Sequence, residues 1–382
     1  MDITREILVA ERERRMVIFD RLMEQNGLAA VVCHANGAMA FQATVKFMTN
    51  LETPCGRFFS MMEKGKQPVA LTGRPDSQFH ARLQSFLDPE NVLCCPDMLS
   101  ELRERINALP GERPRIGVPM LEESPKRFVD MLFATKAEIV DITDAFVVAK
   151  APKAPYEIQL TQEASDLTIE SFEEVVRFIA PGKTEKEVIG MAEGFLRARG
   201  AEDLLILTRG AKPHAFINRP TFKPIDPDGV FVYSAEIAGV GGYWTQIIRP
   251  IFMSKNAHPD AYEVLCIAKE AIAAGAEVFR PGNCINDVAE TVNKVIRKYG
   301  LKEGIWCGHG MGCDLGDGID LVLGNKMEIV PNMVFTLHPS ILSDTDGVLY
   351  ADTFLSTEGA PRCLTAKYQD SPYLDDLRQV IH

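Results

Sequence analysis

Two segments that lie 100 residues apart in the second half of this 382-residue chain are built alike. FIAPGKTEKEV (178–188) and VFRPGNCINDV (278–288) each combine a helix end, a Pro-Gly turn, a capping-type residue and a new helix opened by an acidic residue. Pro-Gly stops one helix, and Thr184 or Asn286 can cap the next, whose first turn favours acids. This echo predicts two related α/β halves; chance recurrence of a common helix-turn-helix pattern is the alternative.

The chain before the echo alternates helical and strand-like patterns. Helical periodicity runs from about residue 8 to Gly27, and further helical patterns lie around 77–87 and 98–108. Pro152 and Pro155 break the structure before a long helix that is expected to begin near Tyr156. We therefore expect an α/β N-terminal domain over residues 1–150 and a second domain over residues 151–382. Candidate strands of the first domain are LAAVVCH (28–34), PVALTG (68–73) and RIGVPM (115–120).

Charge and cysteine usage narrow the class of partner. The formal net charge of −12 argues against a nucleic acid or an anionic membrane as the main partner, because either favours a basic face. A small-molecule substrate is the better expectation. Nine cysteines without a C-x-x-C pair are typical of reduced thiols, and the sequence has no signal-peptide pattern and no apolar run of about 18 residues. A cytoplasmic location is therefore expected.

Three histidines lie where site residues are often found. His338, in FTLHPSIL (335–342), follows a strand-like run that Pro339 ends, because proline cannot donate to a ladder. His309 lies in glycine-rich WCGHGMGCDLGDG (306–318), where the backbone must approach something closely or adopt positive φ. His214 follows a strand in LILTRGAKPHAFINRP (205–220). The residues alone leave open whether His338 is a ligand, a base or a packing residue, and whether His214 is an ordinary surface histidine.

Four further segments carry a family resemblance: GGYWTQIIR (241–249), GHGMG (308–312), VPNMVFTLHPSI (330–341) and ADTFLSTEGAPRCLT (351–365). With them the chain resembles the creatinase and aminopeptidase P-like superfamily, the pita-bread fold of family M24. The resemblance implies a mixed α/β fold with a creatinase-like N-terminal domain and a pita-bread catalytic domain of two pseudo-symmetric halves. It also implies a homodimer, in which Arg57 of one N-terminal domain can reach the neighbouring subunit's pocket.

The metallopeptidases of that family bind two metal ions through two aspartates, one histidine and two glutamates. The resemblance places Gln246 at the second aspartate, His309 at the histidine, His338 at the first glutamate and Ala351, beside Asp352, at the last; the first aspartate falls near 234–236. Because Gln246 and Ala351 cannot bridge divalent ions, the expectation is that the chain uses no metal or cofactor and is not an active metallopeptidase. A single zinc on His309, His338 and Glu236 is the alternative.

Creatinase, a metal-free member of the superfamily, resembles this chain around His214, Asn218 and Arg219. The similarity implies that His214 acts as general base and acid, with His309 and His338 as its catalytic partners. The guanidinium-binding acids of creatinase are absent, since Ile248 and His338 stand in their places. Creatinase activity in the strict sense is therefore not expected.

These observations predict a metal-independent, creatinase-like hydrolase of a non-peptide C–N bond. A lyase that performs β-elimination and a non-catalytic pita-bread binding protein are the alternatives. The expected substrate-binding residues are Glu236, Tyr243, Trp244, Gln246, Arg249 and Arg57. A purely structural role stays open for several of them, because Tyr243 and Trp244 can simply pack against the sheet and Arg249 can stabilise the fold by pairing with a carboxylate.

Overall fold

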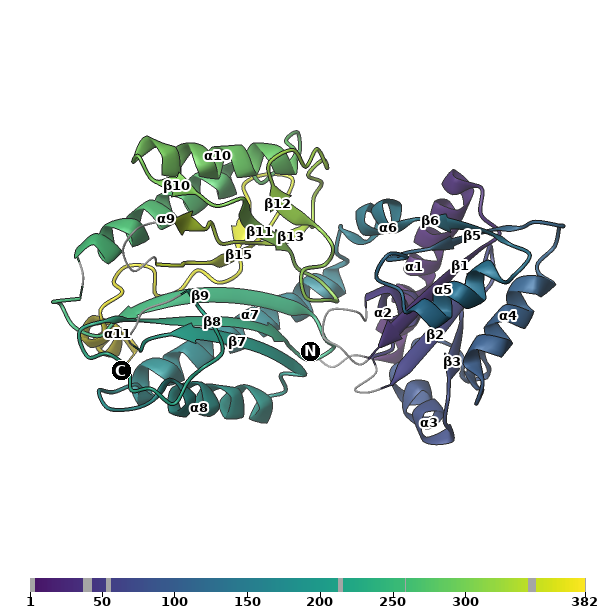
Figure 1. Ribbon diagram of the computed structural model, residues 1–382, viewed down its shortest axis with the longest axis horizontal. Coiled ribbons are helices and arrows are strands. Elements are labelled where there is room, and N and C mark those ends of the chain that lie inside the picture. The colour runs from purple at the N-terminus through teal and green to yellow at the C-terminus, as the bar shows by residue number, and fades with distance from the viewer. Residues whose placement is uncertain are drawn as a thin grey trace. The chain divides into compact units, whose positions relative to one another are not determined.

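The computed structural model describes residues 4–36, 43–52, 56–211, 216–257, 259–342 and 348–381. The chain divides into two compact units, Met1–Lys150 and Ala151–His382 (Figure 1). Both units combine helices with β-sheets, so the mixed α/β class expected from the sequence is confirmed. None of the helices within these ranges has the length and apolarity that crossing a membrane requires.

The first unit is a six-stranded sheet with helices packed against it. The strand order is β4-β3-β2-β1-β5-β6, in which β1 pairs antiparallel with β2 and parallel with β5. The strands are β1 (Ala30–Asn36), β2 (Arg57–Glu63), β3 (Val69–Thr72), β4 (Val92–Cys94), β5 (Arg115–Val118) and β6 (Glu138–Asp141). The helices are α1 (Arg5–Asn26), α2 (Ala43–Thr49), α3 (Pro75–Gln84), α4 (Met98–Ala108), α5 (Lys126–Phe133) and α6 (Thr143–Lys150), with a 3₁₀ turn at Pro89–Asn91.

The second unit repeats one plan twice. Its first half contains α7 (Pro155–Phe178), α8 (Glu185–Ala198) and a sheet of β7 (Asp203–Arg209), β8 (Val230–Ala238) and β9 (Trp244–Phe252). Its second half contains α9 (Pro259–Val278), α10 (Ile285–Lys298) and a sheet of order β12-β11-β13-β15-β16. Those strands are β11 (Trp306–Gly310), β12 (Asp320–Val322), β13 (Val334–Leu337), β15 (Asp352–Leu355) and β16 (Arg362–Cys363). Strands β10 (Lys302–Glu303) and β14 (Ile341–Leu342) pair with each other, and α11 (Leu374–Ile381) follows.

The two helix pairs begin in related but different ways. Thr184 caps α8, since its hydroxyl oxygen accepts from the Glu187 N–H and the Glu187 carboxylate accepts from the Thr184 N–H, so the predicted cap is confirmed. In the second half the cap position is Cys284, whose backbone N–H donates to the Asp287 carboxylate. The prediction that Asn286 caps this helix is wrong: Asn286 lies inside α10, and its side chain accepts from the Gly324 backbone instead.

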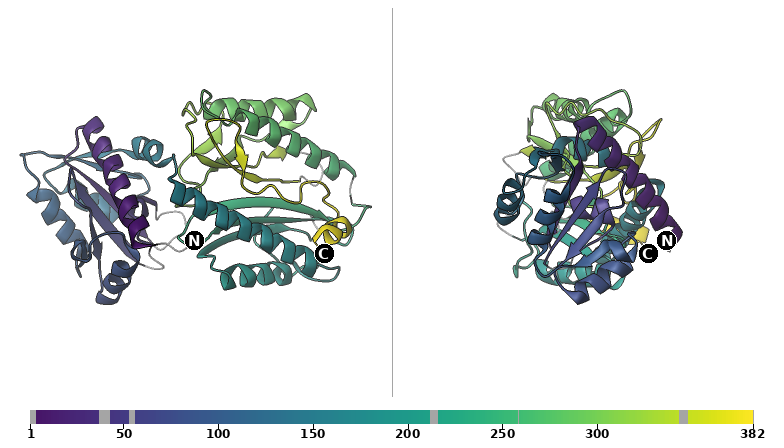
Figure 2. Two further views of the ribbon diagram at one scale, coloured as in Figure 1. Left: turned by 180° about the vertical axis from the view of Figure 1, so that it is seen from behind. Right: turned by 90° about the vertical axis from the view of Figure 1, so that its right-hand side faces the viewer.

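Layers of helix and sheet alternate within the second unit. The sheets of its two halves lie between α7 and α8 on one side and α9 and α10 on the other (Figures 1 and 2). On β8 and β9, the side chains of Phe231, Tyr233, Ala235 and Ile247 join the core formed with α7 and α8. Because strand side chains alternate between faces, Ser234, Glu236 and Gln246 lie on the opposite face. That face of β8 and β9 points toward the sheet of the second half.

The two halves of this unit are joined at one edge of their sheets. Ile248 of β9 forms an antiparallel bridge with Ala351, immediately before β15. The Thr353 hydroxyl donates to the Gln246 backbone carbonyl at 2.8 Å and accepts from the Gln246 N–H at 3.2 Å. These contacts bring residue 246 of one half beside the strands of the other.

Candidate active site

An acid and an amide face each other across β8 and β9. Glu236 and Gln246 are directly opposed in the antiparallel register, so their side chains share a face. The Gln246 amide nitrogen donates to Glu236 Oε1 at 2.8 Å. Gln246 is buried, and the Glu236 side chain is 12% exposed. The pairing holds one carboxylate oxygen in place and leaves Oε2 available for a second contact.

A β-bulge at a glycine of β11 positions the side chains on the opposite side of the site. The register of β11 against β12 shifts between Trp306 and His309, and Gly308 lies between them at φ +140°. A β-carbon at Gly308 would meet the Thr336 carbonyl oxygen at 2.0 Å, so the backbone there requires glycine. The bulge lets Trp306 and His309, three residues apart, stack with ring centroids 5.2 Å apart and planes at 18°.

The imidazole of His309 points toward the carboxylate. His309 Nδ1 lies 3.1 Å from the Gly310 carbonyl oxygen, which can only accept, so Nδ1 carries the proton. In the neutral ring Nε2 is therefore an acceptor. Nε2 lies 3.9 Å from Glu236 Oε2. A proton on Glu236 could pass to this atom directly after a small closure, or through one water molecule.

His338 completes an aromatic cluster with these residues. Its ring centroid lies 5.2 Å from that of His309 and 4.9 Å from that of Trp306, in edge-on arrangements. Its backbone N–H donates to the Cys307 carbonyl, which fixes it at the end of β13. His338 thus points into the group that contains His309.

Burial sets the charges of this group. Desolvation raises the pKa of Glu236 to about 7, because its carboxylate lies away from water and no cation within the described ranges pairs with it. Burial, together with the nearby His309, lowers the pKa of His338 to about 3. Burial also lowers the pKa of His309, although Gly310, Asp320 and Asp317 oppose that shift. Near neutral pH the two imidazoles are uncharged and Glu236 is poised to exchange a proton.

Three buried polar atoms of this face have no hydrogen-bond partner among the described residues: Gln246 Oε1, Thr336 Oγ1 and His338 Nε2. Thr336 lies opposite His309 in the register of β11 and β13, so its side chain shares that face. Buried polar atoms are normally paired, and unpaired ones are costly. Their grouping beside Glu236 is typical of a site that receives a polar ligand.

The donor set does not fit the pair of metal ions that the family's metallopeptidases hold. Gln246 and Ala351 supply no carboxylate, and Glu236 is held by an amide donor. Within the part of the chain that the structure describes, no group of three His, Cys, Asp or Glu side chains could hold a metal ion. The alternative of one zinc on Glu236, His309 and His338 therefore finds no support in these residues.

The other predicted site residues differ in where they lie. Tyr243 is fully buried and donates to Glu157 of α7, away from the cluster. Trp244 is also buried, on β9. Arg57 is exposed at the start of β2 in the first unit. His214 lies outside the described residues.

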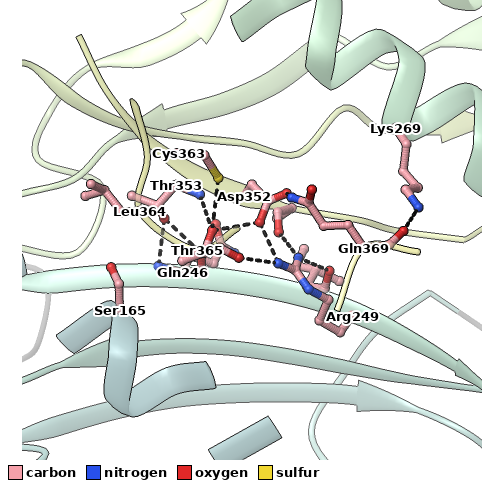
Figure 3. Close-up of polar contacts among 12 residues, drawn as sticks. Ser165, Gln246, Arg249, Lys269, Asp352, Thr353, Cys363, Leu364, Thr365 and Gln369 are labelled. Carbon is pink, nitrogen blue, oxygen red and sulfur yellow. Dashed lines mark hydrogen bonds and ion pairs between the residues drawn. The ribbon is translucent and has the colours of Figure 1, made fainter. Parts of the chain in front are cut away.

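Arg249 belongs to a network of polar contacts with Asp352, Thr365 and Gln369 (Figure 3). Its guanidinium bonds to Asp352 Oδ1 at 2.5 Å and to the carbonyl oxygens of Ala351 and Thr365. Asp352 also accepts from the Thr365 hydroxyl at 2.7 Å and from Gln369 at 3.0 Å. Arg249 and Asp352 are both buried, so this ion pair clamps β9 to β15.

Two residues of the cluster were not among the predicted site residues. Thr336 carries no sequence signal beyond its alternation with His338. Trp306 could have been found, because a glycine between it and His309 permits a bulge that turns both side chains to one face.

Comparison with known proteins identifies the family. The model of metallopeptidase family M24 matches residues 159–358, and the chain belongs to this family. It is 25% identical over 238 residues to the uncharacterized peptidase YqhT of Bacillus subtilis, covering 60% of this chain and 66% of YqhT, just under two thirds of that protein. It is 23% identical over 313 residues to the Xaa-Pro dipeptidase of Pyrococcus horikoshii, covering 78% of this chain and 86% of that protein.

A solved structure confirms the fold expected from the sequence. Dipeptidase PepE of Mycobacterium ulcerans matches with a TM-score of 0.81 and 18% identity, over 96% of this chain and 98% of that chain. The pita-bread fold with an N-terminal domain is therefore confirmed.

These relatives overturn two predictions. The expected hydrolysis of a non-peptide C–N bond is wrong. The expectation that the chain is not an active metallopeptidase is wrong in excluding peptidase activity, because relatives of the chain are peptidases and Xaa-Pro dipeptidases. The error came from equating missing metal ligands with a different substrate. Ligands determine how a bond is activated, whereas the bond attacked depends on what the rest of the site binds.

Proposed function

We propose that this chain is a peptidase for short peptides, in which Glu236 and His309 transfer protons without the paired metal ions of the family's metallopeptidases. The observation that carries the proposal is the geometry of the pair: a carboxylate oxygen faces an acceptor nitrogen at 3.9 Å, on a wall with polar atoms that have no partner among the described residues. The names of the relatives support a small peptide as substrate, with Xaa-Pro dipeptides as the first to test.

Glu236 acts as general base in this proposal. Its carboxylate takes a proton from a water molecule whose oxygen attacks the scissile carbonyl carbon. The C–N bond then breaks, and the leaving nitrogen receives that proton from Glu236, directly or through His309. The pKa of about 7 suits both directions of transfer near neutral pH.

His338 and Thr336 stabilise the developing charge. Each has a buried polar atom that finds no partner in the described parts of the chain, Thr336 on β13 and His338 just after it. A neutral imidazole and a hydroxyl can both donate to an oxygen that becomes negative in the transition state. The low pKa of His338 keeps its imidazole neutral near pH 7, so one ring nitrogen can donate and the other can accept.

Hydrolysis of a panel of dipeptides after dialysis against a chelator tests this proposal. We expect release of free amino acids by the wild-type protein, and a loss of about 100-fold or more in Glu236→Gln, because general-base catalysis contributes roughly 10²–10⁴. The rate of the wild type should rise with pH through about 7, since the base acts when deprotonated.

Glu358→Gln, which removes an exposed carboxylate, is the matched control and should keep the wild-type rate. Full activity in Glu236→Gln would contradict the assigned base. Activity that disappears with the chelator and returns with added metal would contradict the metal-independent chemistry, and binding without release of amino acids would contradict peptidase activity. The homodimer and the cytoplasmic location stay predictions from the sequence.

A further inference from the structure

Trp306 is the exposed member of an otherwise buried aromatic cluster. It is 41% exposed, whereas His309 is 3% and His338 is 7% exposed. One face of the indole covers the His309 ring, and the ring meets His338 edge-on. Trp306 therefore contacts both imidazoles of the site and also reaches solvent. It lies where a substrate entering the site would meet it.

The orientation of Trp306 is fixed by polar and backbone contacts. Indole Nε1 donates to Asp320 Oδ1 at 3.1 Å. The Gly308 bulge and the stack on His309 fix the ring on its other side. A ring held in this way loses little conformational freedom when a ligand packs on it, so its exposed surface is preorganised for binding.

A second observation at the same place concerns a missing partner. Among the described residues, the buried His338 Nε2 has no hydrogen-bond partner, and its ring packs edge-on with that of Trp306. A ligand group that packs on Trp306 is therefore near an atom that needs a polar contact. A flat apolar group joined to a peptide group offers both kinds of contact.

We propose that Trp306 is a specificity-determining residue that packs against a flat, ring-bearing side chain of the peptide substrate. The inference rests on the proposed function for its substrate class, and it concerns recognition and not the chemical step. Trp306 selects between side chains of similar apolar size by their shape, because aromatic pairs gain stacking energy beyond their buried area.

Binding of Ala-Phe and Ala-Leu to the Glu236→Gln protein tests the inference without turnover. The two side chains bury similar apolar surface but differ in flatness. We expect Ala-Phe to bind about three- to tenfold tighter by calorimetry, and adding Trp306→Leu to bring the ratio close to one. Trp306→Phe keeps a ring at this position and should retain part of the preference.

Ile305→Ser is the matched control, because Ile305 is the adjacent residue and is 86% exposed. It should leave the ratio unchanged. Since the chain has only two tryptophans, the emission change on adding Ala-Phe should also disappear in Trp306→Leu. A purely structural role would change the thermal midpoint but not the ratio of the two affinities.

The outcomes separate this inference from the proposed function. A ratio that is unchanged by Trp306→Leu in a folded variant overturns the inference, as does failure of both dipeptides to bind. A ratio that depends on Trp306 supports the inference even if the wild-type protein releases no amino acids, in which case the peptidase proposal alone fails.

Discussion

Glu236 shows how burial alone can adapt one residue to proton transfer. Its neighbours across the site are the Gln246 amide and the neutral imidazole of His309, and among the described residues no cation pairs with it to offset the loss of water. Desolvation is the cause that raises the pKa of its carboxyl to about 7. The same desolvation means that ionised Glu236 lowers the free energy of unfolding.

The stability of the protein should therefore depend on Glu236 and pH together. Its pKa is about 7 in the folded protein against an ordinary value of 4.5, so the unfolded chain releases this proton first as pH rises. The contribution of protonated Glu236 to the free energy of unfolding is fully present below pH 4.5 and is lost as pH rises through about 7. Glutamine does not titrate, and it keeps an oxygen that can accept from Gln246.

We expect Glu236→Gln to become stabilising relative to the wild type as pH rises from 4.5 to 8, by an increment of about 3 kcal/mol. Urea denaturation at several pH values measures this difference. Glu358→Gln serves as the control for loss of an exposed carboxylate. A difference between Glu236→Gln and wild type that stays flat over this range would contradict the assigned burial penalty.

At the residue scale, the sequence predicted the members of the site better than their chemistry. Resemblance brought Glu236, Gln246, His309 and His338 into one list, and the structure places these four together. Tyr243, just before β9, and Arg249, on β9, came from the same segment but point elsewhere, because side chains alternate along an extended chain and β9 is buried on both faces. Alternation relative to Gln246 would have separated both from the site.

At the scale of elements, the β11 bulge couples backbone geometry to the aromatic cluster. Gly308→Ala would place a β-carbon 2.0 Å from the Thr336 carbonyl oxygen and force an unfavourable φ. We expect it to cost at least about 2 kcal/mol of stability. It should also change the tryptophan emission, since Trp306 and His309 lie on either side of the bulge.

Gly324→Ala is the matched control for this change. Gly324 also has positive φ, at +87°, but a β-carbon there would meet nothing within 4 Å. Backbone strain alone should make this variant less costly than Gly308→Ala. Equal denaturation midpoints for the two variants would show that the close approach to Thr336 carries no special weight.

Helix patterns were the most predictable elements, for reasons that particular residues make clear. Gly27 adopts φ +62° and ends α1, and Pro155 opens α7, as expected for a left-handed cap and a first-turn proline. The second cap was misassigned because Cys284 fills the position through its backbone, with Asp287 providing the acceptor. A cap made by a side chain can be recognised from its residue type, whereas a cap position that is satisfied through its backbone N–H has little sequence signal.

At the scale of the whole molecule, the echo at residues 178–188 and 278–288 correctly predicted a second unit of two similar halves. The sequence did not predict how those halves are held together. That depends on pairing between residues about 100 positions apart, such as Ile248 with Ala351, which no local pattern encodes. The buried pair of Arg249 and Asp352 lies at this junction (Figure 3).

The junction should respond strongly to loss of its cation. Arg249→Met leaves the Asp352 carboxylate buried without its charged partner and removes donors to the Ala351 and Thr365 carbonyl oxygens. We expect a loss of about 3–5 kcal/mol, measured by urea denaturation near neutral pH. Arg297→Met is the matched control, because Arg297 pairs with Glu290 and Glu303 while 42% exposed, and should cost about 1 kcal/mol or less. Similar losses in the two variants would show that the buried pair does not clamp the halves together.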